Sequence, residues 1–207
     1  MTPFPARTRI IALAMLALAS LSVTGCVRIG TKPPERLLSI AAATSAPAGQ
    51  TLSASRDSVL FVDLPTVPRA IATVRVAVRT GDTSFAYVKD ALWVDVPARQ
   101  FQGLLAETIR TRTGRLVLDP TQFLARRGQL LEGSLLEFGI DSGRRLAIVT
   151  YDASLLAPDG QSLTRQRFTA SVPVTAIDSQ TVAPAISEAA NQVATAVADW
   201  LKERPAG

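Results

Sequence analysis

Few side chains in this sequence could carry out chemistry. The chain has no histidine, so the commonest general base near neutral pH is missing. Glu132 and Glu137 share an expected strand, and their odd spacing predicts that they point to opposite faces. The other candidate acids are aspartates at expected strand ends and turns, where aspartate favours the turn itself: Asp63, Asp82, Asp90, Asp95, Asp119, Asp141 and Asp159. We expect no catalytic residue, no cofactor site and no metal site, and we predict that the protein is not an enzyme.

The setting of Cys26, the single cysteine of the chain, favours the attachment of lipid. Residues 1–9 carry two arginines and no acid, residues 10–21 form a short apolar run, and small residues precede the cysteine. This order is typical of a secretory signal, and the run is too short for a membrane span of about 20 residues. An ordinary signal peptide with an incidental cysteine, or a buried thiol, are the alternatives.

The segment 21–26, Leu-Ser-Val-Thr-Gly-Cys, resembles the lipobox of bacterial lipoproteins. The resemblance implies a diacylglycerol on the Cys26 thiol, signal cleavage between Gly25 and Cys26, and acylation of the new amine. Two or more acyl chains attach a protein stably to a bilayer, whereas one chain holds it only marginally. Val27 stands where an aspartate would signal retention at the inner membrane. The resemblance therefore implies an outer-membrane anchor with the domain facing the periplasm.

Composition limits the remaining function classes. Removal of residues 1–25 leaves a net charge of +3, because that segment holds two of the 22 basic residues and none of the 17 acidic ones. The longest basic runs are Arg126-Arg127 and Arg144-Arg145, and neither has an aromatic platform beside it, which argues against nucleic-acid binding. The lone cysteine also excludes a disulfide framework, so stability must come from packing.

The order of expected elements predicts the fold class. Residues 26–58 are rich in Ala, Ser, Thr and Pro, which favours a flexible tether, with a short edge strand at 36–40. A single domain then spans residues 59–204. Strands are expected at 59–62, 73–79, 84–88, 91–96, 116–118, 129–140, 146–156 and 162–172. Helices are expected from Pro97 to Gly114 and from Thr181 to Leu201. These elements predict an α+β fold, a mostly antiparallel sheet covered on one face by two helices.

Two pairs of residues leave a functional alternative open. We expect Trp93 and Trp200 to lie in the core, because aromatic side chains dominate burial, and a place on a partner-binding surface is the alternative. The alternation of 73–79 puts Arg75 and Arg79 on the polar face of a strand. We expect both arginines to be solvated, with a partner contact as the alternative.

The order of these elements resembles the ABC-type transport auxiliary lipoprotein family, the lipoprotein partners of MCE-domain lipid transporters. The resemblance covers residues 36–201, although the strand after the cysteine lacks the tyrosine common in the family. The matching pieces are the lipobox at Cys26, the strand 59–62 with its proline-bounded continuation, Tyr87 and Leu92-Trp93 leading through Pro97 into a helix, Leu131-x-Gly133, Pro158-Asp159-Gly160, and Trp200-Leu201.

The resemblance implies a periplasm-facing accessory subunit at the outer membrane that maintains envelope integrity. It would dock on an MCE-domain protein of an ABC lipid transporter, and tether or cap the lipid tunnel without catalysing a reaction. An envelope lipoprotein that regulates or scaffolds cell-wall or outer-membrane assembly is the main alternative. An envelope hydrolase would instead need a convergent polar pocket, and a domain that itself holds lipid would need an apolar cavity between helices and sheet.

Overall fold

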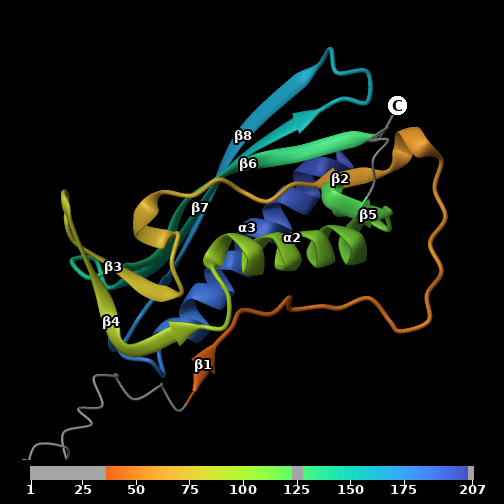
Figure 1. The fold of residues 1–207 in the computed structure, drawn as a ribbon. Coiled ribbons are helices and arrows are strands. Elements are labelled where there is room, and N and C mark those ends of the chain that lie inside the picture. The colour runs from red at the N-terminus through yellow and green to blue at the C-terminus, as the bar shows by residue number, and fades with distance from the viewer. Residues whose placement is uncertain (1–35, 123–127, 205–207) are drawn as a thin grey trace, which may run out of the picture. The chain divides into compact units, whose positions relative to one another are not determined.

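The computed structural model describes residues 36–122 and 128–204, which belong to one compact unit, Pro34–Gly207. The lipidation and cleavage positions Cys26 and Gly25 lie outside the described residues, so both stay predictions. The described part contains an eight-stranded sheet and two long helices, α2 (Pro97–Thr113) and α3 (Val182–Lys202). The α+β fold class is therefore confirmed, and Figure 1 shows both helices on the same side of the sheet.

The sheet is built around one long strand. Strand β6 (Gln129–Asp141) continues into β7 (Leu146–Leu156) and β8 (Leu163–Pro173) as an antiparallel meander. On its other side β6 carries two separate groups of strands. The N-terminal part of β6 pairs in parallel with β2 (Leu60–Val62), which in turn pairs with β5 (Val117–Leu118). The C-terminal end of β6 pairs with β3 (Arg75–Gly81), followed outward by β4 (Ser84–Trp93) and β1 (Leu37–Leu38).

A glycine permits the junction between β6 and β3. A Cβ at Gly139 would lie 2.4 Å from the carbonyl oxygen of Ala77, closer than any side chain allows. The parallel pairing of Ala77 with Gly139 therefore depends on the missing side chain. The long antiparallel pairs β6–β7, β7–β8 and β3–β4 still dominate the sheet, as the sequence predicts.

The helices begin and end where their sequence predicts. Pro97 occupies the first turn of α2, and Gly114 closes the helix in the left-handed conformation at φ 69°. Helix α3 starts directly after Thr181, so Pro184 falls in the first turn, where a missing N–H costs no hydrogen bond. The alanine-rich inner face of α3 is fully buried, which lets the helix lie close to β7 and β8.

Both tryptophans lie in the core, which confirms the expectation for them. Trp93 packs edge-on against Phe138 of β6, with ring centroids 5.6 Å apart, and Trp200 packs in the same way against Phe168 of β8. Between them, Tyr151 of β7 packs against Phe101 of α2, with ring centroids 5.2 Å apart. Because Tyr151 contacts α2, its neighbour Asp152 must point to the opposite face of the sheet.

One expectation for the strands is wrong. The sequence predicts two strands, 84–88 and 91–96, separated by a bend at Lys89-Asp90. The structure instead has one continuous strand, β4, in which Asp90 adopts a positive φ of 53° and the pairing with β3 shifts register. The polar Lys-Asp pair therefore marks a bulge, which bends a strand without ending it.

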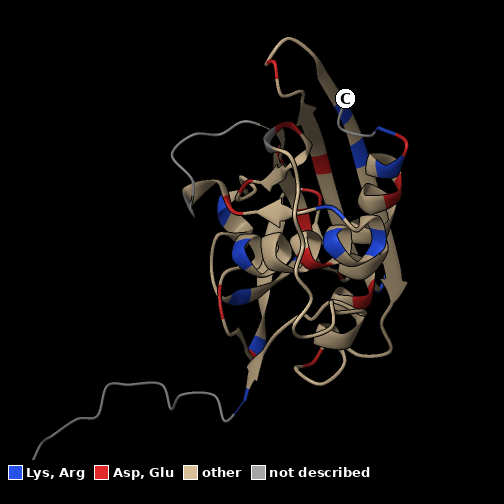
Figure 2. Cartoon of the chain, turned by 90° about the vertical axis from the view of Figure 1, so that its right-hand side faces the viewer, with Lys and Arg blue, Asp and Glu red and all other residues tan. Residues whose placement is uncertain are grey.

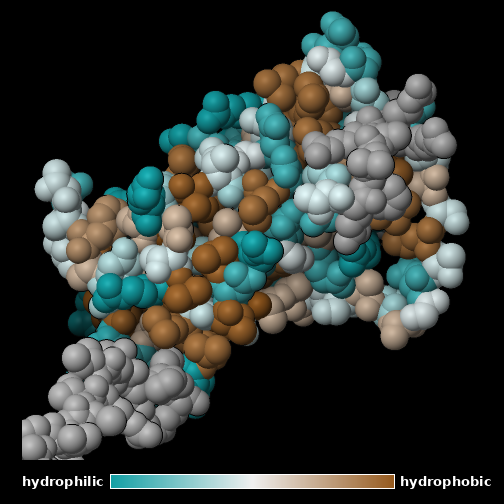
Figure 3. All heavy atoms as spheres, viewed as in Figure 1, coloured by the Kyte–Doolittle hydropathy of each residue, from teal (hydrophilic) through white to brown (hydrophobic). Residues whose placement is uncertain are grey.

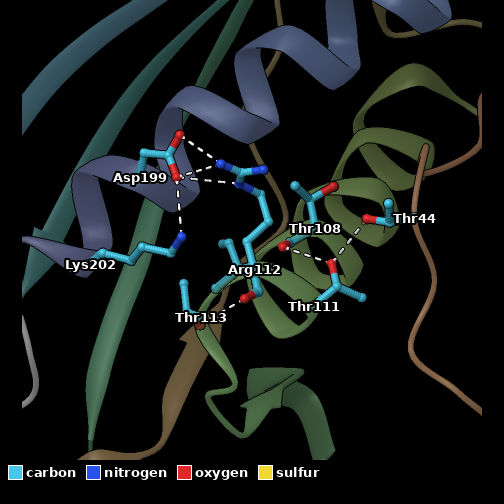
Figure 4. A network of polar contacts seen from close by, with 8 residues as sticks. Thr44, Thr108, Thr111, Arg112, Thr113, Asp199 and Lys202 are labelled. Atoms are coloured by element: carbon cyan, nitrogen blue, oxygen red, sulfur yellow. Dashed lines mark hydrogen bonds and ion pairs between the residues drawn. The ribbon is translucent and has the colours of Figure 1, made fainter.

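The described start of the chain is held against the helices over part of the expected tether. We call residues 39–46 the strap. Gln100 of α2 accepts a hydrogen bond from the Ile40 amide at 3.0 Å, and Asn191 of α3 accepts one from Ala43 at 2.8 Å and donates one to the Ala41 carbonyl at 2.9 Å. Figure 4 shows Thr44 of the strap beside Thr111 of α2.

The same close-up shows an ion pair that ties the two helices to each other. Asp199 of α3 receives a bidentate pair from Arg112 of α2, at 2.8 and 2.9 Å, and a weaker contact from Lys202. Because the strap lies on elements fixed in this way, residues 39–46 belong to the folded body. The limits of the tether and of the domain otherwise stay predictions.

The surface charge is mixed, as expected for a chain without a long basic run. Figure 2 shows Lys and Arg interspersed with Asp and Glu over the side of the domain that it presents. Within the described ranges, no helix is long and apolar enough to cross a membrane.

Candidate interaction face

The face of the sheet turned away from the helices carries the polar residues of the fold. We call it the helix-free face. Three neighbouring strands place Ser134 of β6, Asp152 of β7 and Arg167 of β8 in one row across it. The next rows contain Glu137, Thr150 and Thr169 on one side, and Glu132, Ser154 and Arg165 on the other. Side chains in directly opposite register positions lie close enough to interact.

Asp152 is a buried carboxylate paired with two arginines. Its side chain is 6% exposed, whereas the guanidinium groups of Arg165 and Arg167 are mostly in solvent. Arg167 donates to both carboxylate oxygens, at 2.5 and 2.7 Å, and Arg165 donates at 3.0 Å. These hydrogen bonds from Arg167 and then Arg165 lower the pKa of Asp152 to about 2, against the opposing effect of burial. The aspartate is therefore charged at neutral pH, and both of its carboxylate oxygens accept hydrogen bonds from arginine.

A second polar cluster contains Glu137. It pairs with Arg79 of β3 and accepts a hydrogen bond from the Thr150 hydroxyl at 2.6 Å, and Thr169 contacts Thr150 at 3.2 Å. Arg79 is thus ion-paired within the domain, which the sequence analysis did not expect. Arg75 is exposed, with its guanidinium 3.9 Å from the centroid of the Tyr87 ring, so its solvated position is confirmed.

The expectation that Glu132 and Glu137 face opposite sides is wrong. A bulge between Leu135 and Glu137 places two residues of β6 opposite one of β7, so the alternation changes phase. Glu132 lies opposite Ser154 and Glu137 opposite Thr150, on the same face. These partners are four residues apart on β7, about 13 Å at 3.3 Å per residue. The two carboxylates are therefore too far apart to act as a pair.

An apolar hollow of about 140 Å³ opens on the helix-free face beside Glu137. Its walls come from the short helix η3 (Arg69–Ile71), from β3 and from β6, and Phe85 of β4 stands at its rim with half of its surface exposed. Ile71, Ala77 and Ile148 supply apolar lining, and Arg79 and Glu137 supply charge. The lipid-holding alternative predicts a cavity between helices and sheet, whereas this hollow lies on the other face.

Asp152 and Glu137 are already paired with arginines. The described parts of the chain bring together no group of three or more His, Cys, Asp or Glu side chains that could hold a metal ion. The expected turn aspartates act locally. Asp95, Asp119 and Asp159 each accept a hydrogen bond from a backbone amide one or two residues onward.

The sequence analysis missed Asp152. Its signal is a lone acid within the apolar run 147–156, followed one strand later by the alternate arginines Arg165 and Arg167. The turn 157–160 could have fixed the pairing of β7 with β8, and that register places Arg167 directly opposite Asp152.

Comparison with solved structures supports the fold. A crystal structure of protein XCC0632 from Xanthomonas campestris, assigned to the DUF330 family, superimposes with a TM-score of 0.67 at 20% identity, and covers 81% of this chain and 95% of its own. The crystal structure of an uncharacterized protein gives a TM-score of 0.58 at 16% identity, with 74% and 95% covered. At such identities the likeness concerns the fold alone. No curated protein matches the sequence.

The family model of the ABC-type transport auxiliary lipoprotein component matches residues 39–198. The match includes the whole strap, the whole meander and most of α3. This chain belongs to the family of ABC-type transport auxiliary lipoprotein components.

Proposed function

We propose that this protein is a non-catalytic outer-membrane lipoprotein that serves as an accessory subunit of an ABC transporter moving lipid between membranes through an MCE-domain protein. Cys26 would carry the acyl chains, and the domain would face the periplasm. The family match over residues 39–198 is the observation that carries this proposal, because the family is defined as a transport auxiliary component.

The helix-free face supports a docking role. Asp152 and Glu137 are neutralised by arginines, so a partner can cover these two carboxylates without burying an unpaired charge. The exposed ring of Phe85 beside an apolar hollow has the character of an interface anchor, since aromatic side chains and pockets dominate binding energy. We propose that the MCE-domain protein contacts this face.

Site-specific crosslinking tests the proposal. A photoreactive amino acid replaces Phe85 in the full chain, tagged at the C-terminus, and crosslinked products are recovered from membranes and identified by mass spectrometry. Ile177 provides a matched control, because it is also exposed but lies in the connection between β8 and α3. We expect the Phe85 position to capture the MCE-domain protein, and the Ile177 position to capture much less of it.

Other captured proteins would decide against the proposal. A peptidoglycan synthase crosslinked at Phe85 would favour the scaffolding alternative. Equal capture of the MCE-domain protein from both positions would support this partner, but it would show that the helix-free face is not the contact surface. Replacement of Cys26 by serine tests the anchor separately. We expect this variant to lose the acyl chains from its mass and to leave the outer-membrane fraction.

A further inference from the structure

A small apolar patch lies where the chain enters the folded domain. Leu37 of β1 and Val94, which follows β4, are 52% and 56% exposed. They are neighbours, because Leu37 pairs with Leu92 and the Val94 amide donates to the Leu38 carbonyl at 2.7 Å. We call Leu37, Leu92 and Val94 the entry patch. Figure 3 shows hydrophobic side chains gathered over this end of the domain, at β1 and the end of β4.

Positive charge surrounds the entry patch. Arg36 directly precedes Leu37 and is exposed, and Arg75 lies opposite Leu92 in the β3–β4 register. Asp95, directly after Val94, is ion-paired with Arg99 at 3.5 Å, so these two charges offset each other. Exposed apolar side chains flanked by arginine are typical of surfaces that rest on anionic phospholipid.

The pairing of β1 with β4 places the patch close in sequence to the expected anchor. Leu37 is held opposite Leu92, and ten residues lie between Leu37 and Cys26. At about 3.5 Å per residue they span at most about 40 Å. A domain of this size is itself about 30 to 40 Å across, so the patch stays within one domain width of the bilayer.

We propose that the entry patch rests on the phospholipid surface of the membrane that carries the anchor. This inference depends on the proposed lipidation of Cys26. Leu92 lies opposite Arg75 and Phe85 opposite Arg79, four residues apart on β3, so the patch lies about 13 Å along the sheet from Phe85. Contact with the membrane gives the domain a fixed orientation on the bilayer.

Fluorescence quenching in vesicles tests the contact. The lipidated full-length protein is reconstituted in vesicles of phosphatidylethanolamine and phosphatidylglycerol, with Val94→Cys carrying an environment-sensitive dye. The acylated Cys26 does not react, so the dye marks one position. Leu163→Cys is the matched control, because Leu163 is 60% exposed at the start of β8, in the β7–β8 hairpin far from β1.

We expect nitroxide-labelled phospholipid to quench the dye at position 94 several-fold more strongly than at 163, and aqueous iodide to show the reverse order. Leu37→Cys provides a second site, for which the same result is expected. Equal quenching at 94 and 163 in protein that floats with the vesicles would overturn the inference and leave the proposed function intact. Protein that does not float, with unmodified Cys26, would overturn the proposed anchoring and this inference with it.

Discussion

Replacement of Asp152 by asparagine tests whether the ion pairs of the helix-free face stabilise the fold. The change keeps the shape of the side chain but removes its charge. It leaves Arg165 and Arg167 without a carboxylate, although both remain hydrated because they are mostly exposed. No charge becomes buried without a partner, so the loss of stability reports the interaction itself.

The pKa of Asp152 sets the size of the effect. Its pKa falls from the ordinary 3.8 to about 2 in the folded protein, and about 1.4 kcal/mol accompanies each tenfold change in the acid dissociation constant. The upper limit is therefore about 2.4 kcal/mol, and solvent screening of the exposed arginines reduces the expectation to about 1 to 2 kcal/mol. Because the folded pKa is lowered, this stability is fully present above about pH 4 and declines as the pH falls, with about half left near pH 3.

Urea unfolding followed by the fluorescence of the buried Trp93 and Trp200 measures the effect. We expect Asp152→Asn to lower the free energy of unfolding by about 1 to 2 kcal/mol at about pH 7, and by about half as much at about pH 3. Asp82→Asn, in the exposed β3–β4 turn, is the control and should change it by less than about 0.5 kcal/mol. An Asp152→Asn protein as stable as the wild type at both pH values would show that desolvation cancels the pairing.

Four further substitutions test the packing and the hydrogen bonds of the strap. Gly133→Ala should lower the free energy of unfolding by about 2 to 3 kcal/mol, because its Cβ would lie 2.1 Å from the Asp152 carbonyl oxygen and 2.8 Å from the Tyr151 ring. Gly103→Ala should raise the free energy of unfolding by about 0.5 to 1 kcal/mol in the same urea titration, because a Cβ at this position of α2 would meet open space. Tyr151→Phe should leave stability unchanged or raise it by about 1 kcal/mol, since the buried hydroxyl has no hydrogen-bond partner among the described residues, and a loss above that size would reveal a hidden partner. Asn191→Ala should speed hydrogen exchange of the Ala43 amide about fivefold, because it removes a hydrogen bond worth about 1 kcal/mol. Gln192→Ala is the control and should leave this exchange unchanged, because the Gln192 side chain bonds Glu188 and not the strap.

Local patterns were sufficient to predict most of the elements. The meander strands follow from apolar alternation and from Pro158-Asp159-Gly160, since proline and glycine favour the turn between β7 and β8. The limits of α2 follow from Pro97 and Gly114, which act within one turn of the chain. Such signals depend on neighbours in the sequence, so they can be recognised in one chain without its tertiary structure.

Contacts between distant segments could not be predicted in the same way. The strap lies in a segment with the Ala, Ser, Thr and Pro composition of a flexible linker, and its order comes from Gln100 and Asn191, far along the chain. Glu107 also accepts a hydrogen bond from the Ala46 amide at 2.6 Å. Because composition describes a segment by itself, it cannot report side chains that arrive from another element.

The bulge in β6 shows why one unpredicted residue matters for function. In a regular strand without the bulge, Leu136 would lie opposite Thr150 and Glu137 opposite Val149, so Glu137 would point toward the helices, where an unpaired carboxylate among apolar side chains costs several kcal/mol. With the bulge, Glu137 reaches Arg79 and links the meander to the β3–β4 hairpin across the helix-free face. The same two elements form walls of the apolar hollow. A partner seated in the hollow therefore contacts both elements at once, and the ion pair fixes the distance between them before the partner arrives.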